Sequence, residues 1–398
     1  MIAQALTGMK IVDLSQVLAG PYCSMVLADM GAEVIKVEKY PNGDDTRQMG
    51  PYVKEESYMY MMVNRNKRGI CLNLKKEEGI QILKELVKDA DVIIENYRPG
   101  VTNKLGIDYE TLKAINPSLI YCSISGYGQT GPYKNKGGYD IMAQGLSGIM
   151  DMTGEREGKP VKVGIAIHDI AAAQTAIQSI LSAYIYRLKS GVGQYIDVSL
   201  VDAGLAWTVW EAAAYFGKGE IPKRNSTAHR VSSPYQGFQT KDGSILIGAG
   251  NQKLWEKFCL YVINKPEWIN DKRFLTNSIR TQNVNQLELE IETVLQEKCS
   301  SEWLSLLDEH GIPCSPIYSY DQALEDEHIL SRDMVLNYEH PIAGPMKTLG
   351  FPAKFSETPG QLSSPAPLLG QHNREVLDEL GFSEEKIREL VSKGVLNN

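Results

Sequence analysis

Residues 10–38, "KIVDLSQVLAGPYCSMVLADMGAEVIKVE", contain the pattern of one strand, one helix and a second strand. "KIVDLS" and "EVIKVE" are short apolar runs typical of buried strands. Between them, Pro21 suits the first turn of a helix and Gly31 suits the position after its end. This stretch therefore predicts a strand-helix-strand unit.

The same order of elements is repeated further along the chain. "KKEEGIQILKELVKDA" at 75–90 is a helical pattern that leads into the strand-like "DVIIEN", and "ETLKAINPS" at 110–118 leads into "LIYCSIS". Strands that alternate with helices at short intervals form a parallel sheet covered by helices. We therefore predict the α/β fold class, with a Rossmann-like large domain built on a parallel sheet.

A smaller α+β domain is predicted in the second half of the chain. After a polar stretch, "YQGFQTKDGSILIGAG" places a Lys-Asp-Gly turn between two strand-like runs, which is a hairpin signal. The predicted organisation is a first part of the large domain at 1–217, a linker at 218–235, the small domain at 236–325, a second linker at 326–350 and the C-terminal part of the large domain at 351–398.

The composition is that of an ordinary globular protein. Of the 398 residues, 43% are hydrophobic and 23% are charged, which is enough to bury a large core. With 41 basic against 49 acidic residues, the net charge of -8 argues against a nucleic-acid partner. No apolar run is long enough to span a membrane and the first residues lack a signal-peptide pattern, so we expect a cytoplasmic protein. The scattered cysteines contain no C-x-x-C pair and indicate neither disulfides nor a metal site.

One glycine-rich segment matches the pattern of a dinucleotide-binding loop. "GYGQTG" at 126–131 has the spacing G-x-G-x-x-G and follows the strand-like "LIYCSIS". However, "PYKNKGG" stands where a helix should present its N-terminus to a pyrophosphate, and no acidic residue ends a second strand about 20 residues on. We expect these glycines to allow a close approach to another ligand or to another backbone segment.

A carboxylate stands where an extended segment turns into a long helical pattern. "GIAIHDIAAAQ" at 164–174 places Asp169 just before apolar positions that recur at helical spacing as far as Tyr184. An aspartate at such a position usually caps the helix by accepting a backbone N–H bond. A catalytic role is the alternative, and this stretch alone does not decide between the two.

Five long segments follow one another along nearly the whole chain: residues 14–38, "NRNKRGICLNLK" at 64–75, "ENYRPG" at 95–100, "SGYGQTGPYKNKGGYDIMAQGLSG" at 125–148 and "SGVGQYIDVSL" at 190–200. In this order they resemble the hallmark segments of the class III CoA-transferases, the CaiB/BaiF family of formyl-CoA and carnitine-CoA transferases. The resemblance implies transfer of CoA from an acyl-CoA thioester to a small carboxylic acid. It also implies that Asp169 is the nucleophile and forms an aspartyl mixed anhydride and then an aspartyl-CoA thioester.

The same resemblance implies a set of binding residues. CoA is expected as a substrate, and no cofactor is expected to be tightly bound. "GAGNQ" at 248–252 resembles the mobile glycine-rich loop that covers the active site of formyl-CoA transferases, and Gly248, Gly250 and Gln252 are its candidate residues. The positions that contact CoA in the family correspond here to Leu18, Ala19, Lys39, Leu72, Asn73, Lys75, Asn96, Tyr97, Arg98, Lys104 and Tyr139.

The basic run of Arg65, Lys67 and Arg68 has two interpretations that the sequence does not separate. These residues can form a solvated surface turn, or they can contact the phosphates of CoA.

Two other functions compete with CoA transfer. An α-methylacyl-CoA racemase shares the fold and binds CoA thioesters, but it uses a His-Asp pair to move a proton. Such racemases have "GHDINY" where this chain has "GGYDIMA", so Tyr139 replaces the catalytic histidine. His168 lies beside Asp169, but adjacent residues at a helix start point in different directions. A non-catalytic acyl-CoA-binding homologue is the second alternative.

The resemblance also implies an assembly. Family members form interlocked homodimers in which the two domains and two linkers of each chain encircle the other chain. The predicted linkers are long and rich in Pro, Gly and polar residues, as crossing segments can be. We therefore expect an interlocked homodimer with each active site near the interface, and nothing in the sequence identifies the two acids that exchange CoA.

Overall fold

The computed structural model describes residues 4–397, and these residues form two compact units. The first unit contains the chain up to Ile149, Lys162–Gly219 and the chain from Glu327 onward, and the second contains Met150–Val161 and Glu220–Asp326. Each unit has a hydrophobic core of its own. The predicted domain boundaries and linkers stay predictions.

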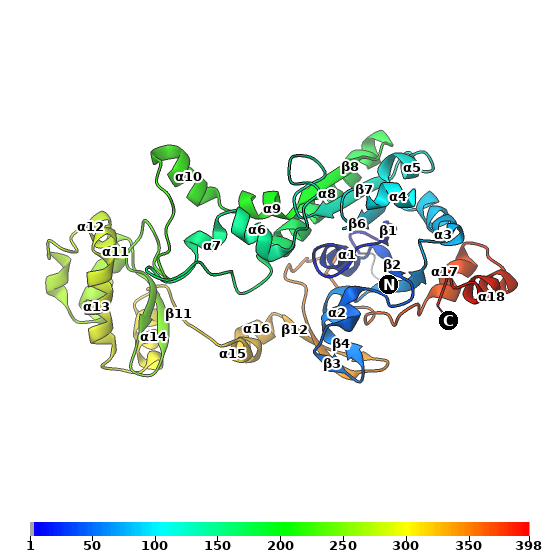
Figure 1. Ribbon diagram of the computed structural model, residues 1–398. Helices are drawn as coiled ribbons and strands as arrows, with labels where there is room; N and C mark the ends of the chain where they lie inside the picture. The colour runs from blue at the N-terminus through cyan, green and yellow to red at the C-terminus, as the bar shows by residue number, and fades with distance from the viewer. Residues whose placement is uncertain (1–3, 398) are drawn as a thin grey trace. The chain divides into compact units, whose positions relative to one another are not determined.

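The first unit is built on a six-stranded sheet in which all neighbouring strands are parallel (Figure 1). In chain order, the third, second, first, fourth, fifth and sixth strands lie side by side, which is the order of a doubly wound α/β fold. The predicted α/β class and parallel sheet are confirmed. From edge to edge the strands are β5 Lys67–Leu72, β2 Glu33–Lys39, β1 Lys10–Asp13, β6 Val92–Glu95, β7 Ile120–Ser125 and β8 Tyr195–Ser199.

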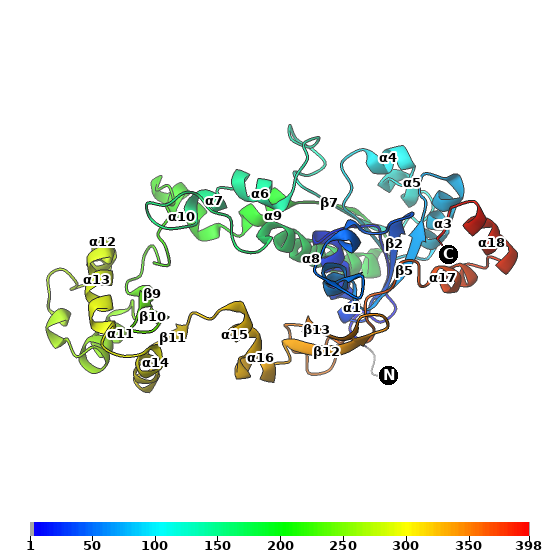
Figure 2. The ribbon, with the colours of Figure 1, turned by 60° about the horizontal axis from the view of Figure 1, so that its bottom comes forward.

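Helices cover both faces of this sheet (Figure 2). Ile94 packs into the core beneath α1 and α8, whereas its neighbour Ile93 packs into the core beneath α3, α17 and α18. Strands buried on both faces consist of continuous apolar runs because successive side chains point to opposite sides. None of the helices within residues 4–397 has both the length and the apolarity to cross a membrane. The five covering helices are α1 Ala19–Asp29, α8 Ile167–Ser190, α3 Glu77–Lys88, α17 Asn373–Glu379 and α18 Glu384–Ser392.

The C-terminal segment covers the edge strand β5. Gly69 N donates to His372 Nδ1 at 3.0 Å, and Cys71 N donates to Asn373 Oδ1 at 2.9 Å. Leu72 pairs with Leu396 in an isolated antiparallel bridge. An open strand edge is a site for pairing with other chains, and these bonds protect it.

Shorter elements complete this part of the chain. The hairpins are β3 Tyr52–Val53 with β4 Glu56–Ser57, and β12 Val335–His340 with β13 Gly344–Leu349. The short helices are α2 Tyr58–Asn64, α4 Val101–Leu105, α5 Tyr109–Lys113, α6 Asp140–Leu146, α9 Leu200–Ala206, α10 Val209–Lys218 and α16 Glu327–Ser331. Helix α7 Ile149–Met152 begins with the last residue of this part of the chain and continues into the second unit.

The second unit has a three-stranded antiparallel sheet with helices around an aromatic core. The predicted hairpin is present, because β9 pairs with β10 across the turn that contains Lys241, Asp242 and Gly243. Trp255 is buried against the rings of Phe258, Trp268 and Phe274, and Trp303 is buried in the same core. Its elements are β9 Tyr235–Gln239, β10 Ser244–Gly248, α11 Gln252–Lys257, α12 Asn277–Gln282, α13 Val284–Leu295, α14 Ser300–Glu309, β11 Cys314–Pro316 and α15 Tyr320–Glu325.

Both interpretations of the basic run are wrong for Arg65 and Lys67. Arg65 is buried and forms an ion pair of 2.6 Å with Asp29, and Lys67 is buried 3.1 Å from Asp13. Arg68 pairs with three glutamates at the sheet edge. All three cations therefore pair with the protein's own carboxylates, Arg65 and Lys67 in the interior and Arg68 at the surface, which a local charge pattern does not reveal.

The segment 126–131 passes close to another backbone, as predicted. A Cβ atom built on Gly126 would lie 2.7 Å from the Cα of Gly138, so only glycine fits there. No helix begins directly after this segment, and the chain runs irregularly to α6. The helix that a dinucleotide-binding loop needs is therefore not present at this place.

Candidate active site

A pocket of about 670 Å³ opens at the carboxyl ends of β1, β6 and β7. Its wall contains the segment 16–19 after β1, the segment 96–99 after β6, and the end of β7 with the segment 126–127 that follows it. The strand order reverses between β1 and β6, and open α/β sheets bind ligands in the crevice at such a point. Residues around the starts of α6 and α8 also line the pocket, together with Asp45, Leu200 and lysines of the segment 134–136.

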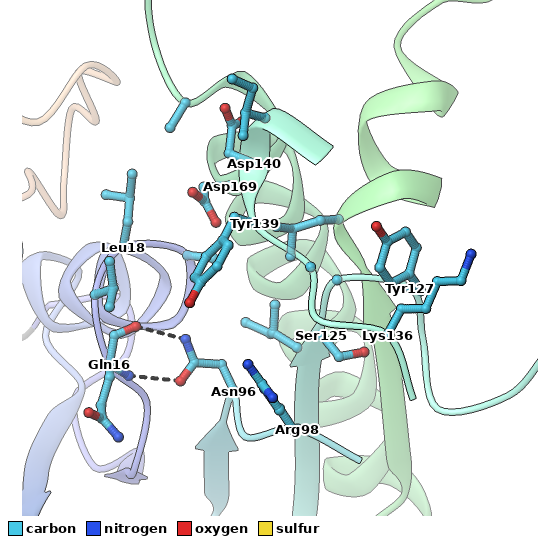
Figure 3. A pocket seen from close by; sticks show the side chains of 18 of the residues that line it. Gln16, Leu18, Asn96, Arg98, Ser125, Tyr127, Lys136, Tyr139, Asp140 and Asp169 are labelled. Atoms are coloured by element: carbon cyan, nitrogen blue, oxygen red, sulfur yellow. Dashed lines mark hydrogen bonds between the residues drawn. The ribbon is translucent and has the colours of Figure 1, made fainter. Parts of the chain in front are cut away.

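Asp169 lies in the first turn of α8 and lines this pocket (Figure 3). The helix begins at Ile167, after Ala166, and no side chain of its own caps it. Asp140, at the start of α6, accepts the backbone N–H of His168 at 2.8 Å. Of the two interpretations of Asp169, the helix cap is therefore wrong, because a carboxylate from another helix performs that task.

The environment of Asp169 disfavours its charged form. Burial, and then the neighbouring Asp140 carboxylate, raise the pKa of Asp169 to about 7. Within residues 4–397, no hydrogen bond or ion pair holds the Asp169 carboxylate. A carboxylate that is partly removed from water and lacks a partner is a stronger base and nucleophile than an exposed one.

His168 does not take part in this pocket. Its ring is fully buried, with Nδ1 2.8 Å from the carbonyl oxygen of Leu200 and Nε2 3.0 Å from Ser147 Oγ. Gly204 of α9 packs against the ring, since a Cβ there would lie 2.0 Å from Nδ1. Both ring nitrogens are thus engaged away from the pocket, which removes the histidine that a racemase would need.

The structure brings one group of the predicted CoA-binding residues to the pocket wall and leaves a second group outside it. The first group is Leu18, Ala19, Asn96, Tyr97, Arg98 and Tyr139. Figure 3 shows the Tyr139 ring between Asp169 and Asn96. The second group is Lys39, Leu72, Asn73, Lys75 and Lys104.

The residues of the second group differ in their surroundings. Leu72 is fully buried in the core beneath α3, and Asn73 donates to the carbonyl oxygen of Gly394 at 3.1 Å. Lys75 and Lys104 are exposed. Lys39 pairs with Asp45, which itself lines the pocket, and the CoA contacts of all these residues stay predictions.

Several polar residues of the wall were missed by the sequence reasoning. Ser125 ends β7, and its hydroxyl oxygen is buried without a hydrogen-bond partner among the described residues. The carboxyl end of a strand is the only sequence signal that points to Ser125. Most of the positive charge of the wall comes from three lysines that lie in segments without regular structure. They are Lys134, Lys136 and Lys162.

The candidate loop residues Gly248, Gly250 and Gln252 belong to the second unit. The loop is held by Arg280, which is fully buried and donates to the Gly250 carbonyl at 3.0 Å and to Gln252 Oε1 at 3.2 Å. Gly250 approaches Ser232 so closely that a Cβ would lie 1.8 Å from its hydroxyl oxygen. A covering role for this loop stays a prediction.

The fold and the site together define an α/β enzyme with a ligand pocket at the switch point of a parallel sheet. A carboxylate of raised pKa faces that pocket from a helix start, and several cationic side chains line other parts of the wall.

Comparison with known proteins gives the family. Residues 6–373 match CoA-transferase family III. The chain is 40% identical to the succinyl-CoA:glutarate CoA-transferase of Mus musculus, over 98% of this chain and 90% of the mouse protein. It is 36% identical to the succinate-glutarate CoA-transferase of Agrobacterium fabrum, over 94% of this chain and 95% of that protein. A crystal structure of a CaiB/BaiF family protein from Brucella suis superimposes with a TM-score of 0.86 at 38% identity, over 95% of this chain and 99% of that chain.

The chain belongs to CoA-transferase family III and is a CoA-transferase.

Proposed function

We propose that this enzyme transfers CoA from succinyl-CoA to a dicarboxylic acid of similar size, such as glutarate, with Asp169 as the nucleophile. The observation that carries the proposal is the unpaired Asp169 carboxylate in the pocket at the switch point of the sheet. The choice of acids is supported by the mouse and Agrobacterium relatives, which are named for succinate or succinyl-CoA and for glutarate.

The chemistry consists of acyl transfers to and from Asp169. The carboxylate attacks the thioester carbonyl carbon, the C–S bond breaks, and CoA leaves as a thiolate from a mixed anhydride. The thiolate then attacks the aspartyl carbonyl carbon of the anhydride and releases the donor acid, which leaves an aspartyl-CoA thioester. The acceptor carboxylate repeats these steps in reverse, so one thioester is exchanged for another and no ATP is consumed.

The pocket can help this weak nucleophile in two ways. Fixed geometry between reacting groups supplies on the order of 7 to 11 kcal/mol in favourable cases. Leu18 and Ala19 also line the pocket at the start of α1, and no acceptor among residues 4–397 bonds their backbone N–H groups. Such donors can stabilise the negative charge that develops on the thioester oxygen.

The substrate proposal is tested by mixing the purified enzyme with succinyl-CoA and one acid at a time and identifying the CoA esters by mass spectrometry. Glutaryl-CoA should form faster than the CoA ester of any monocarboxylic acid of similar length. Absence of a new CoA ester with every acid would refute the proposal, whereas a preference for monocarboxylic acids would correct only the acceptor class.

The rate should depend on pH through Asp169. The ionised carboxylate attacks, so kcat/KM for succinyl-CoA should rise with pH and level off above the Asp169 pKa of about 7. Asp140→Asn should move this rise to lower pH, because it removes the neighbouring negative charge while keeping an oxygen for the His168 N–H. Steady-state kinetics across the pH range measure both profiles.

Glu95 provides the matched control for this experiment. Burial raises its pKa to about 7 as well, but Glu95 does not line the pocket. Glu95→Gln should therefore leave the midpoint of the pH profile in place. If the midpoint of the pH profile shifted in Glu95→Gln and stayed unchanged in Asp140→Asn, the assignment of this pKa to Asp169 would be contradicted.

We also propose that the enzyme is an interlocked homodimer. The apolar helix α10 supports this, because none of its residues is buried and Val209 and Phe216 are 61% and 83% exposed. The double variant Val209→Glu/Phe216→Glu should dissociate into monomers and lose activity, since it places charge on an apolar surface that a second copy would cover. Analytical ultracentrifugation measures the mass.

Leu289→Glu on α13 is the control, because Leu289 is 68% exposed among charged helix neighbours. It should leave mass and activity unchanged. A wild-type monomer that is active at nanomolar concentration would refute the dimer.

A further inference from the structure

Val17 has a backbone conformation that is unusual for its residue type. It lies between β1 and α1, lines the pocket, and has a φ of 70°. Left-handed backbone angles are rare for residues with a Cβ atom, and a β-branched side chain makes them a steric outlier. Such a conformation persists only when surrounding groups hold it.

Side chains from other elements hold four backbone polar groups of residues 15–17. Val17 N donates to Asp44 Oδ1 at 3.2 Å. Asn96 accepts from Gln16 N at 2.8 Å and donates to the Gln16 carbonyl at 2.7 Å, as the dashed lines of Figure 3 show. Lys36 Nζ donates to the Ser15 carbonyl at 2.6 Å. Both the oxygen and the nitrogen of the Asn96 side-chain amide are thus bonded to the backbone of Gln16.

The groups that hold the loop belong to a network of buried charges. Lys36 lies 3.0 Å from Asp44, and Lys67 lies 3.1 Å from Asp13. All four side chains are fully buried. Burial alone would raise the pKa of Asp44, but the Lys36 ammonium and the bonds from Thr46 lower it below its usual value. The attraction within such ion pairs is stronger in the protein interior than at the surface. Removing one charge of a buried pair lowers stability, because the other charge is left buried and unpaired.

The loop leads directly to the backbone amides at the start of α1. Leu18 and Ala19 line the pocket, and their N–H groups have no acceptor in the described chain. Gly20 packs so tightly on Ser15 that a Cβ would lie 2.2 Å from the Ser15 Cβ. The direction of these amides therefore depends on the conformation of the loop before them.

We propose that Asp44 is a positioning residue: supported by Lys36, it holds Val17 in its left-handed conformation and so fixes the amides of Leu18 and Ala19 at the pocket. This inference rests on the proposed function of the pocket. It assigns a role to the segment "GDDTR", which contains Asp44 and Thr46 and lies outside the predicted CoA-binding residues.

Asp44→Asn tests the proposal with Asp29→Asn as the matched control. Both substitutions neutralise a buried carboxylate that pairs with a cation, but the Asp29 and Arg65 pair does not touch the loop. Asn keeps an oxygen but loses the ion pair that fixes the side chain on Lys36, so it no longer holds the Val17 N–H in place. Asp44→Asn should therefore lower kcat about tenfold to hundredfold and change KM for succinyl-CoA less than about threefold, because the amides are misdirected after binding. Asp29→Asn should lower the melting temperature to a similar degree and leave kcat within about twofold of wild type.

A second substitution separates loop conformation from stability. Adding Val17→Gly to Asp44→Asn should restore kcat by about threefold or more, because glycine adopts positive φ without steric strain. Hydrogen exchange of the free wild-type protein should be slow at Gln16 and Val17 and fast at Leu18 and Ala19, and Asp44→Asn should accelerate the first pair.

Equal kcat losses in the Asp44 and Asp29 variants, absence of rescue by glycine, or unchanged exchange at Val17 would each overturn the proposal. Failure of the proposed function has a different signature. It would appear as a wild-type enzyme without a covalent adduct on Asp169, and it would not alter the exchange rates of the free protein.

Discussion

Asp169→Asn should lower turnover on the order of 10⁴-fold or more while leaving the fold and CoA binding intact. Asparagine has nearly the same shape but lacks the carboxylate that attacks the thioester. Because Asp169 does not cap α8, the substitution removes no helix-capping bond. Steady-state kinetics, CoA binding by calorimetry and circular dichroism measure the three properties separately.

The same variant should be at least as stable as wild type above neutral pH. The folded-state pKa of Asp169 is raised from 3.8 to about 7, so ionisation favours the unfolded chain and lowers stability as the pH rises through this interval. Melting temperatures at about pH 8 should therefore be equal or higher for the asparagine variant. This advantage should disappear below the unfolded-state pKa of 3.8, where the wild-type carboxyl is protonated in both states.

A covalent adduct provides the independent test of Asp169. Wild-type enzyme mixed with succinyl-CoA and no acceptor should accumulate an aspartyl-CoA thioester, which hydroxylamine converts to a hydroxamate. Peptide mapping should find the modification on residue 169. Transfer of CoA without an adduct there, or substantial activity in the asparagine variant, would refute the proposed mechanism.

Gly204→Ala should destabilise the protein by about 2 kcal/mol and lower kcat about tenfold or more. The added Cβ would lie 2.0 Å from Nδ1 and 2.1 Å from Cε1 of the buried His168 ring, so α9 and α8 must move apart. His168 precedes Asp169 in the first turn of α8, and its displacement moves the nucleophile. Urea denaturation and steady-state kinetics measure the two effects.

His168→Ala provides the control for this second prediction. It removes the ring, so Gly204→Ala should cost little additional stability in that background. The two substitutions should therefore be strongly non-additive. Additive losses would show that the Gly204 contact with His168 is not the cause.

The large-scale fold could be predicted because its signals are local. The stretch 10–38 contains β1, α1 and β2, and the alternation of such units is sufficient to indicate a parallel sheet. The location of Asp169 at the start of a long helix was likewise predicted. Its candidate role as nucleophile, however, came from the family resemblance and not from the residues next to it in sequence. The alternative interpretation of Asp169 as a helix cap fails because Asp140, 28 residues before His168 in sequence, accepts the His168 N–H instead.

Long-range pairing limited the remaining predictions. Lys67 looked like a surface residue because its partner Asp13 is 54 residues away in sequence, and burial of that pair depends on the finished fold. The pocket lysines Lys134 and Lys136 lie in an irregular segment without periodicity, so no local pattern distinguishes them from solvated lysines. Val17 has an ordinary apolar sequence context, and only the structure reveals its positive φ.

The bonds between β5 and the C-terminal segment have a consequence for synthesis on the ribosome. Leu72 pairs with Leu396, so the edge of the first sheet stays open until more than three hundred further residues have emerged. The second unit, by contrast, makes most of its contacts within residues 220–326 and can fold while it is being made. The nascent chain therefore spends most of its elongation with an unprotected strand edge, which is the period in which binding by a chaperone would matter most.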